Sequence, residues 1–238
     1  MEEQKKNIFE QGQVLLFNKP LYWTSFDLVN KVRVMIMRTM GIRKIKVGHA
    51  GTLDPLATGL MIICTGTATK RIEEFKDLDK EYIATLYLGK TTASFDLETE
   101  TEGNYPTEHI SLNLVQNVLS GFLGEQQQVP PLHSAKLIGG RRAYKYARKG
   151  IEMELKPVKV LFREIELISY GIPETTVRIL CSKGTYIRSF ARDFGRALNS
   201  GCHLSGLERT AIGDYRLEKA YTVEKFAEFL EQMKQIQY

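Results

Sequence analysis

A glycine-rich segment at residues 48–67 constrains the fold of this chain more than any other part of the sequence. It reads Gly-His-Ala-Gly-Thr-Leu-Asp-Pro-Leu-Ala-Thr-Gly-Leu-Met-Ile-Ile-Cys-Thr-Gly-Thr. Its glycines allow sharp turns and close backbone approach, whereas Pro55 fixes its own φ and pushes Asp54 out of the α region. We therefore expect the backbone to hold the Asp54 carboxylate at the edge of an apolar run, as a candidate catalytic group. The alternative is that the Asp-Pro pair forms an Asx turn or a helix cap.

The length and the order of the elements predict the fold class. A chain of 238 residues is long enough for one large domain or two joined subdomains. We expect one catalytic domain over residues 13–238, after a flexible polar segment at residues 1–12. Strand-like and helix-like segments interleave without a strict strand–helix–strand rhythm. This order favours an α+β fold, with a mixed, largely antiparallel sheet and flanking helices.

Hydrophobic patterns predict the individual elements. Apolar and β-branched residues indicate strands at residues 14–17, 80–88, 158–169 and 176–182. Helical spacing of apolar residues indicates helices at residues 112–122, 185–198 and 222–233. One more helix should have Ser25 as its N-cap and bury the apolar residues Phe26, Val29, Val32, Ile36 and Met40.

Basic residues are segregated along the chain, although the net charge is only +5. Residues 31–46 contain six Lys or Arg and no acid, and residues 126–150 repeat that count. Because phosphate neutralisation supplies much of nucleic-acid affinity, this pattern indicates a basic face for a polyanion. An ordinary solvated surface is the alternative.

Cysteine, histidine and apolar patterns indicate where the protein works. The three cysteines are far apart, and the four histidines lack metal-ligand spacing. We expect reduced thiols, a cytoplasmic location and no metal. The polar N-terminus and the lack of an apolar run of about 18 residues predict neither a signal peptide nor a membrane span.

The glycine-rich segment resembles the signature loop of the tRNA pseudouridine synthase B family, Gly-His-x-Gly-x-Leu-Asp-Pro-x-Ala-x-Gly, and fills every fixed position of it. Four further segments agree in order: Val-Leu-Leu-Phe-Asn-Lys-Pro at 14–20 with Thr24-Ser25, Lys-Glu-Tyr at 80–82, Val-Pro-Pro-Leu-His-Ser-Ala-Lys at 129–136 and Cys-Ser-Lys-Gly-Thr-Tyr-Ile-Arg at 181–188. Together these segments extend the resemblance over about residues 13–213.

The resemblance implies a pseudouridine synthase fold with an RNA-binding insertion at about residues 126–152, and a reaction that needs no cofactor. Only about thirty residues follow the segment at 206–210. They are too few for the C-terminal RNA-binding PUA domain of longer relatives, so we expect a short form of the family.

The resemblance also implies catalytic roles for three residues. Asp54 is the candidate nucleophile or charge stabiliser, since carboxylates take a covalent role in other glycosyl transfers. Arg188 is its expected counterion, with an ordinary salt bridge as the alternative. Tyr82 is expected to stack on a uracil that has left the duplex stack and to pass a proton, whereas a lone strand tyrosine usually belongs to the core.

Other positions are expected to contact the RNA. His49 would fill the vacated space or meet a neighbouring base, Leu207 would wall the pocket, and Lys19 would contact phosphate or position a loop. A structural histidine and a core leucine are the alternatives. The residues expected to line the RNA within the insertion are Lys136, Arg141, Arg142, Tyr144, Lys145 and Arg148. An amphipathic helix that buries Tyr144 and Ala147 would explain the same spacing.

These observations predict an enzyme that isomerises the T-loop uridine at position 55 of tRNA. It would bind the T arm without an obligatory protein partner and without a membrane. One rival is a noncatalytic RNA-binding or RNA-folding protein, which would need neither Asp54 nor Arg188. The other is a relative of the same chemistry that works in an RNA complex with partner proteins.

Overall fold

The computed structural model describes residues 7–132, 137–138, 141–142, 151, 153 and 155–236. The chain divides into two compact units. Unit 1 comprises residues 1–80 and 208–238, and unit 2 comprises residues 81–207. The candidate catalytic residues are divided between them, because Asp54 belongs to unit 1 while Tyr82 and Arg188 belong to unit 2.

The strands of unit 1 surround β3 (Ala57–Thr65). Strand β1 (Val14–Lys19) is antiparallel to β3, as is the short β2 (Val47–His49). The second half of β12 (Cys202–Ile212) also lies beside β3 and pairs with β13 (Tyr215–Arg216). Strand β3 is buried over nearly its whole length, so it forms the centre of this core.

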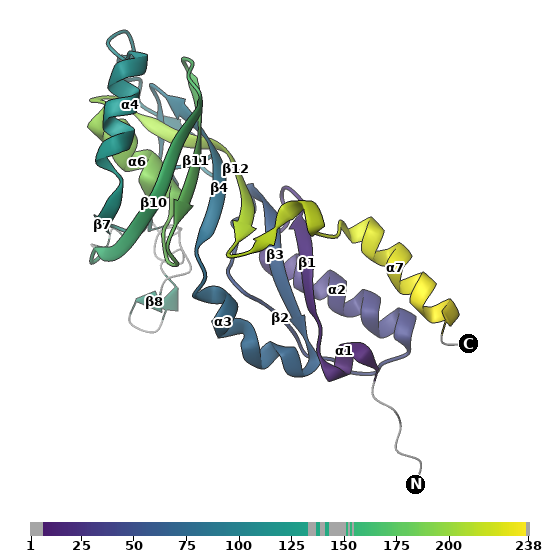
Figure 1. Ribbon diagram of the computed structural model, residues 1–238. Coiled ribbons are helices and arrows are strands. Elements are labelled where there is room, and N and C mark those ends of the chain that lie inside the picture. The colour runs from purple at the N-terminus through teal and green to yellow at the C-terminus, as the bar shows by residue number, and fades with distance from the viewer. Residues whose placement is uncertain are drawn as a thin grey trace. The chain divides into compact units, whose positions relative to one another are not determined.

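Helices cover the strands of unit 1, and Figure 1 shows α2 (Ser25–Met40) and α7 (Val223–Ile236) side by side. The shorter helices are α1 (Ile8–Gln11), η1 (Gly66–Arg71), α3 (Ile72–Lys76) and η2 (Leu217–Lys219). We expected flexible backbone through residue 12, whereas α1 has a capping box and buries Phe9 against Phe226 of α7. The ordered part of unit 1 therefore begins before residue 13.

The start of α2 differs from the prediction in two respects. Thr24, not Ser25, is the N-cap, because its side chain accepts from the Asp27 N–H while Asp27 accepts from the Thr24 N–H. The predicted burial of Phe26 is also wrong, since this ring is 67% exposed. Leu28 is buried in its place, because it shares with Val32 and Ile36 the four-residue spacing that defines the inner stripe.

Unit 2 is built on an antiparallel sheet in the order β4, β11, β10, β7, with the first half of β12 beside β4. The bounds are β4 (Lys80–Leu88), β7 (Gly124–Gln128), β10 (Val158–Ser169) and β11 (Glu174–Cys181). Strand β4 alternates buried and half-buried residues throughout, which is typical of a strand with one face on the core.

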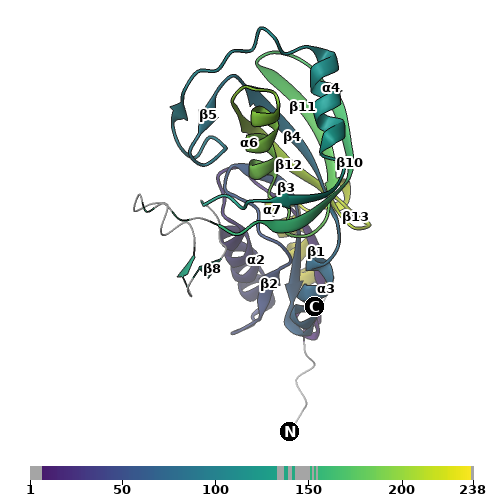
Figure 2. The same cartoon turned by 90° about the vertical axis from the view of Figure 1, so that its left-hand side faces the viewer.

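Helices α4 (Leu112–Gly121) and α6 (Ile187–Ala197) lie along this sheet (Figure 2). Phe162 of β10 packs against Phe122 and Phe190, and Phe190 stacks on Phe194 one helical turn later. Two short antiparallel strand pairs complete the described elements: β5 (Thr91–Thr92) with β6 (Thr101–Glu102), and β8 (Leu137–Ile138) with β9 (Arg141–Arg142).

The predicted α+β class and largely antiparallel sheet are confirmed. All the predicted strands and helices are present within a few residues of their expected bounds. The sequence patterns missed β12, whose polar residues interrupt the apolar ones. No helix in the described ranges is both long and apolar enough to span a bilayer.

Candidate active site

The Asp54 loop, residues 50–56, connects β2 to β3 and is anchored through its main chain. The Ser25 hydroxyl accepts a hydrogen bond from the Leu53 N–H at 2.9 Å and donates one to the Leu53 carbonyl at 3.0 Å. The buried Ser25 side chain thus pairs with both main-chain polar groups of Leu53, the residue before Asp54. The hydroxyl expected to cap a helix instead fixes the candidate catalytic loop.

A buried arginine connects the start of the same loop to β3. Arg209 is only 1% exposed, and its guanidinium donates to the Leu60 carbonyl at 2.7 Å and to the Gly51 carbonyl at 3.2 Å. Gly59 has φ +103°, and a Cβ there would lie 2.4 Å from the Arg209 carbonyl oxygen. Glycine is therefore required at position 59 for the close approach of β3 to β12.

Lys19 forms the third anchor of the Asp54 loop. Its ammonium donates to the carbonyls of Trp23 at 2.6 Å, Pro20 at 2.9 Å and Pro55 at 3.4 Å, and its side chain has no exposed surface. Of the two roles that we expected, loop positioning fits this burial. A direct phosphate contact does not, since no surface of the side chain is available to a phosphate.

The charges around the loop favour an ionised Asp54. Burial lowers the pKa of Lys19 to about 8, while the charge of Asp54 acts in the opposite direction and raises it. Lys19 therefore remains mostly protonated at neutral pH. Since a nearby cation favours the charged form of a carboxyl group, the Lys19 ammonium favours the Asp54 carboxylate in turn.

His49 ends β2, at the entrance to the loop. Burial lowers its pKa, so the ring is neutral at physiological pH. Its Nδ1 has no hydrogen-bond partner among the described residues. A partly buried, neutral ring suits contact with an uncharged base, but its predicted RNA role remains a prediction.

In unit 2, Arg188 lies in the first turn of α6 and is 4% exposed. Its guanidinium donates to the Ser94 carbonyl at 3.3 Å, and its Nε lies 3.7 Å from the Asp96 carboxylate. Asp96 is itself buried and accepts from the Glu98 N–H. Arg188 thus has a carboxylate within unit 2, and the predicted counterion role toward Asp54 remains a prediction.

The base of the predicted insertion is fixed to α6 close to Arg188. The Gln128 side chain accepts from the Tyr186 N–H at 2.8 Å and donates to the Tyr186 carbonyl at 3.1 Å. The Val129 carbonyl accepts from the Ser189 hydroxyl and from the Arg192 guanidinium. The described backbone that enters the insertion and the helix that carries Arg188 are therefore held as one assembly.

Tyr82 and Leu207 occupy neighbouring strands of unit 2. Tyr82 lies near the start of β4, as predicted, and is buried, which also fits the core alternative, so its stacking on uracil stays a prediction. Leu207 lies on β12 and is half-buried, so part of its side chain is open to a ligand.

Most residues that were expected to line the RNA fall on the insertion. Arg141 and Arg142 form strand β9, and their predicted RNA contacts stay predictions. Lys136, Tyr144, Lys145 and Arg148 lie outside the described residues, as does the alternative helix with Tyr144 and Ala147.

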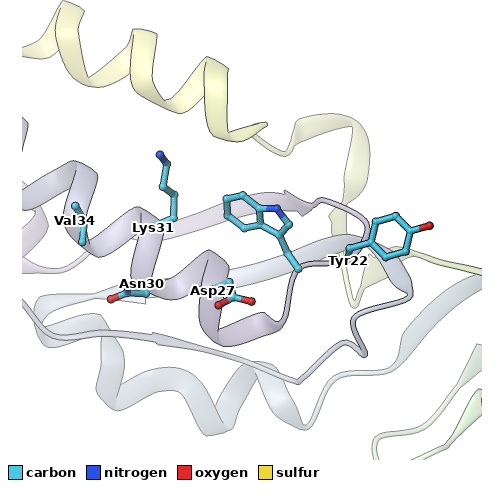
Figure 3. A pocket seen from close by; sticks show the side chains of 6 residues that line it. Tyr22, Asp27, Asn30, Lys31 and Val34 are labelled. Carbon is cyan, nitrogen blue, oxygen red and sulfur yellow. The ribbon is translucent and has the colours of Figure 1, made fainter. Parts of the chain in front are cut away.

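Two hollows lie on unit 1. The first, of about 560 Å³, is lined by residues 22–23 and by one side of α2, including Asp27, Asn30, Lys31 and Val34 (Figure 3). The second, the basic groove, measures about 640 Å³ and includes Arg33, Arg43, Lys44 and Lys46 in its lining, which has no acidic residue. Val47 and Gly48 of β2 also line the groove, and the Asp54 loop follows β2 in the sequence.

Sequence reasoning missed two residues that shape the loop, Arg209 and the hydroxyl of Ser25. No local signal marked Arg209, because it lies in the polar stretch Glu208-Arg209-Thr210 and charged residues are mostly exposed. For Ser25 the local signal pointed elsewhere, since a serine before an apolar helical run indicates a cap.

Comparison with known proteins identifies the family. A profile described as TruB family pseudouridylate synthase (N terminal domain) matches residues 38–187. The chain is 60% identical over 224 residues to tRNA pseudouridine synthase B of Phocaeicola vulgatus, covering 94% of this chain and 95% of that protein. It is 50% identical over 222 residues to tRNA pseudouridine synthase B of Flavobacterium johnsoniae, covering 93% of this chain and 97% of that protein.

Solved structures with the same fold are more distant in sequence. A chain of a Cbf5-Nop10-Gar1 complex has a TM-score of 0.71 at 23% identity, and one from an H/ACA RNP bound to a substrate RNA has a TM-score of 0.69 at 22% identity. Each match covers 97% of this chain but only 57% of the other, and at this identity it shows a shared fold. From the profile and the close relatives together, the chain belongs to the TruB family of pseudouridylate synthases.

Proposed function

We propose that this tRNA pseudouridine synthase converts the T-loop uridine at position 55 of tRNA to pseudouridine, with Asp54 as its catalytic carboxylate. The observation that carries the proposal is the Asp54 loop, in which Ser25, Arg209 and Lys19 all hold the main chain around one carboxylate. Such preorganisation places a reacting group without the need to rearrange the loop during reaction.

The reaction rearranges one base on one ribose. The bond between uracil N1 and ribose C1′ breaks, the base turns, and a bond forms between C5 and C1′; the proton on C5 leaves and N1 gains one. Asp54 acts as the nucleophile and forms a transient bond to the base or to ribose C1′; this bond breaks again before the product leaves, which regenerates the carboxylate. No cofactor or external energy source enters this balance.

The residues of unit 2 complete the proposed chemistry. Arg188 supplies a guanidinium that stays charged and stabilises negative charge on Asp54. The Tyr82 ring stacks on the extruded uracil, which offsets part of the few kcal/mol that extrusion costs. Leu207 contributes apolar surface to the pocket, and His49 meets the space that the base leaves.

Binding of the T arm relies on the basic segments. The basic groove of unit 1 attracts the phosphate backbone, and Lys136, Arg141, Arg142, Tyr144, Lys145 and Arg148 contact the RNA from the insertion. We propose that the enzyme acts in the cytoplasm without an obligatory protein partner. The buried cysteines Cys64, Cys181 and Cys202 form no disulfide, which is compatible with a reducing compartment.

The rival function, a noncatalytic RNA-binding protein, is not favoured, because close relatives over nearly the whole chain are named as tRNA pseudouridine synthases. Release of tritium from a tRNA transcript labelled at uracil C5 tests the proposal. Release is expected from the native protein, and not from Asp54→Asn or from a transcript with cytidine in place of the target uridine. Release by Asp54→Asn would show that Asp54 is not needed for the reaction. Release from the cytidine transcript would show that position 55 is not the site of the reaction.

A further inference from the structure

Tyr22 has an unusual backbone conformation for a bulky residue. Its φ is +66°, in the left-handed region that favours glycine, and its side chain is 74% exposed. An exposed ring buries little apolar surface in the fold, so packing does not compensate for this strain. Strained residues of this kind gather at ligand contacts and active sites.

The backbone of Tyr22 is fixed to the Asp54 loop. Its N–H donates to the Pro55 carbonyl at 2.8 Å, so Tyr22 is bonded to the residue directly after Asp54. The carbonyls of its neighbours Pro20 and Trp23 accept from the buried Lys19 ammonium. The turn that carries the exposed ring is therefore held on both sides.

The surface around Tyr22 combines apolar and polar groups. Leu21 and Phe26 are exposed as well, and all three side chains belong to unit 1. Figure 3 shows the Tyr22 ring projecting from the turn at one end of the hollow, while Asp27 and Asn30 present oxygen atoms from α2. An exposed aromatic ring suits an unpaired nucleobase, because every base has a π-face that stacks on such a ring.

We propose that the Tyr22 ring stacks on an unpaired base of the substrate RNA, distinct from the uridine that reacts. The proposal rests on the proposed function, since it takes tRNA as the ligand. The Tyr22 N–H is hydrogen-bonded to the Pro55 carbonyl. A base stacked on the Tyr22 ring would therefore have a fixed position relative to the Asp54 loop. Tyr22 thereby acts as an RNA-positioning residue for the reaction.

The substitution Tyr22→Gly separates this role from a structural one. Glycine relieves the left-handed φ, so the melting temperature should equal or exceed that of the native protein, while kcat/KM for tRNA should fall about tenfold, equivalent to about 1.4 kcal/mol. Tyr22→Phe keeps the ring and should retain kcat/KM within about twofold of native. Dissociation constants for tRNA can be measured in the Asp54→Asn background, which prevents turnover. There Tyr22→Gly should bind tRNA more weakly than the parent, and Tyr22→Phe should bind nearly as tightly as the parent.

Asn199→Gly is the matched control, because Asn199 is also exposed, has φ +51° and lies in unit 2 at the end of α6. It should leave kcat/KM and affinity unchanged. If Tyr22→Gly keeps native kcat/KM and affinity, or if Tyr22→Phe loses as much as Tyr22→Gly, the stacking role is overturned. An inactive native protein would instead contradict the proposed function, and tRNA affinities in the Asp54→Asn background would still test Tyr22.

Discussion

The two units each hold a charged group of the proposed reaction, but they fix it by different means. In unit 1 the Asp54 loop is anchored through its main chain, by Ser25 on Leu53 and by Arg209 on Gly51. In unit 2 Arg188 is anchored through its own side chain, by the Ser94 carbonyl and the Asp96 carboxylate.

This difference predicts how each unit tolerates substitution. The Asp54 side chain can be replaced while the main-chain anchors of its loop remain, so a loss of activity there should come with only a small loss of stability. Replacement of Arg188 removes the reacting charge and its anchors together. Replacement of Arg188 should therefore lower activity and stability together.

The largest expected effect that sharpens the comparison is that of Arg188→Lys. A single ammonium cannot reproduce the planar guanidinium that meets both Ser94 and Asp96, so kcat should fall about 10³-fold and the melting temperature should also drop. Asp54→Asn, by contrast, should lose turnover with a much smaller drop in melting temperature. Arg178→Lys, at a partly exposed site with three carboxylates, is the control for the same change in chemistry. Near-native kcat for Arg188→Lys would reduce Arg188 to a structural role.

The next effect concerns the anchor of unit 1. Arg209→Met removes the donor from the buried Leu60 carbonyl and from the part-buried Gly51 carbonyl, and should lower the free energy of unfolding by about 3 kcal/mol. Urea denaturation measures this change. Arg216→Met, at an exposed position in the same unit, should stay within about 0.5 kcal/mol of native. Equal stability of the two variants would show that the loop does not depend on Arg209.

A smaller effect should appear in the pH dependence of stability. The pKa of Lys19 is lowered to about 8 from 10.5 by burial, so between these values the unfolded state binds more protons than the folded state. The contribution of Lys19 to the free energy of unfolding therefore rises as the pH increases from about 8 to 10.5, and this gain is lost as the pH falls back through about 8. From pH 8 to pH 10 the native protein should gain about 1–2 kcal/mol relative to Lys19→Met, as measured by urea denaturation. Parallel curves for the two proteins would contradict the depressed pKa.

The smallest effect tests the basic groove of unit 1. The double variant Arg43→Gln, Lys44→Gln should weaken tRNA binding severalfold and reduce the slope of log affinity against log salt concentration by about 1–2, because each lost phosphate contact releases about one counterion fewer. Lys225→Gln with Lys234→Gln on α7 removes the same charge away from the groove lining and serves as the control. An equal change in slope for both pairs would indicate a general charge effect.

Much of the fold was predictable because its signals are local. Alternation of apolar residues predicted β4 with its observed bounds, and helical spacing predicted α4, α6 and α7 within a few residues. The signature loop predicted a backbone-held Asp54, since the restrictions of glycine and Pro55 act within a few residues. In each case the residues that decide the structure are neighbours in the sequence.

The sequence by itself thus determined the class of fold, the family and the identity of the candidate carboxylate. Only the tertiary structure decided that Ser25 binds Leu53 rather than caps α2, that Lys19 is buried against carbonyls, and that Phe26 faces outward. The physical reason is range: the bond from Arg209 to the Leu60 carbonyl joins residues 149 positions apart. Local propensity carries no information about such a contact, because it forms only once distant strands have paired.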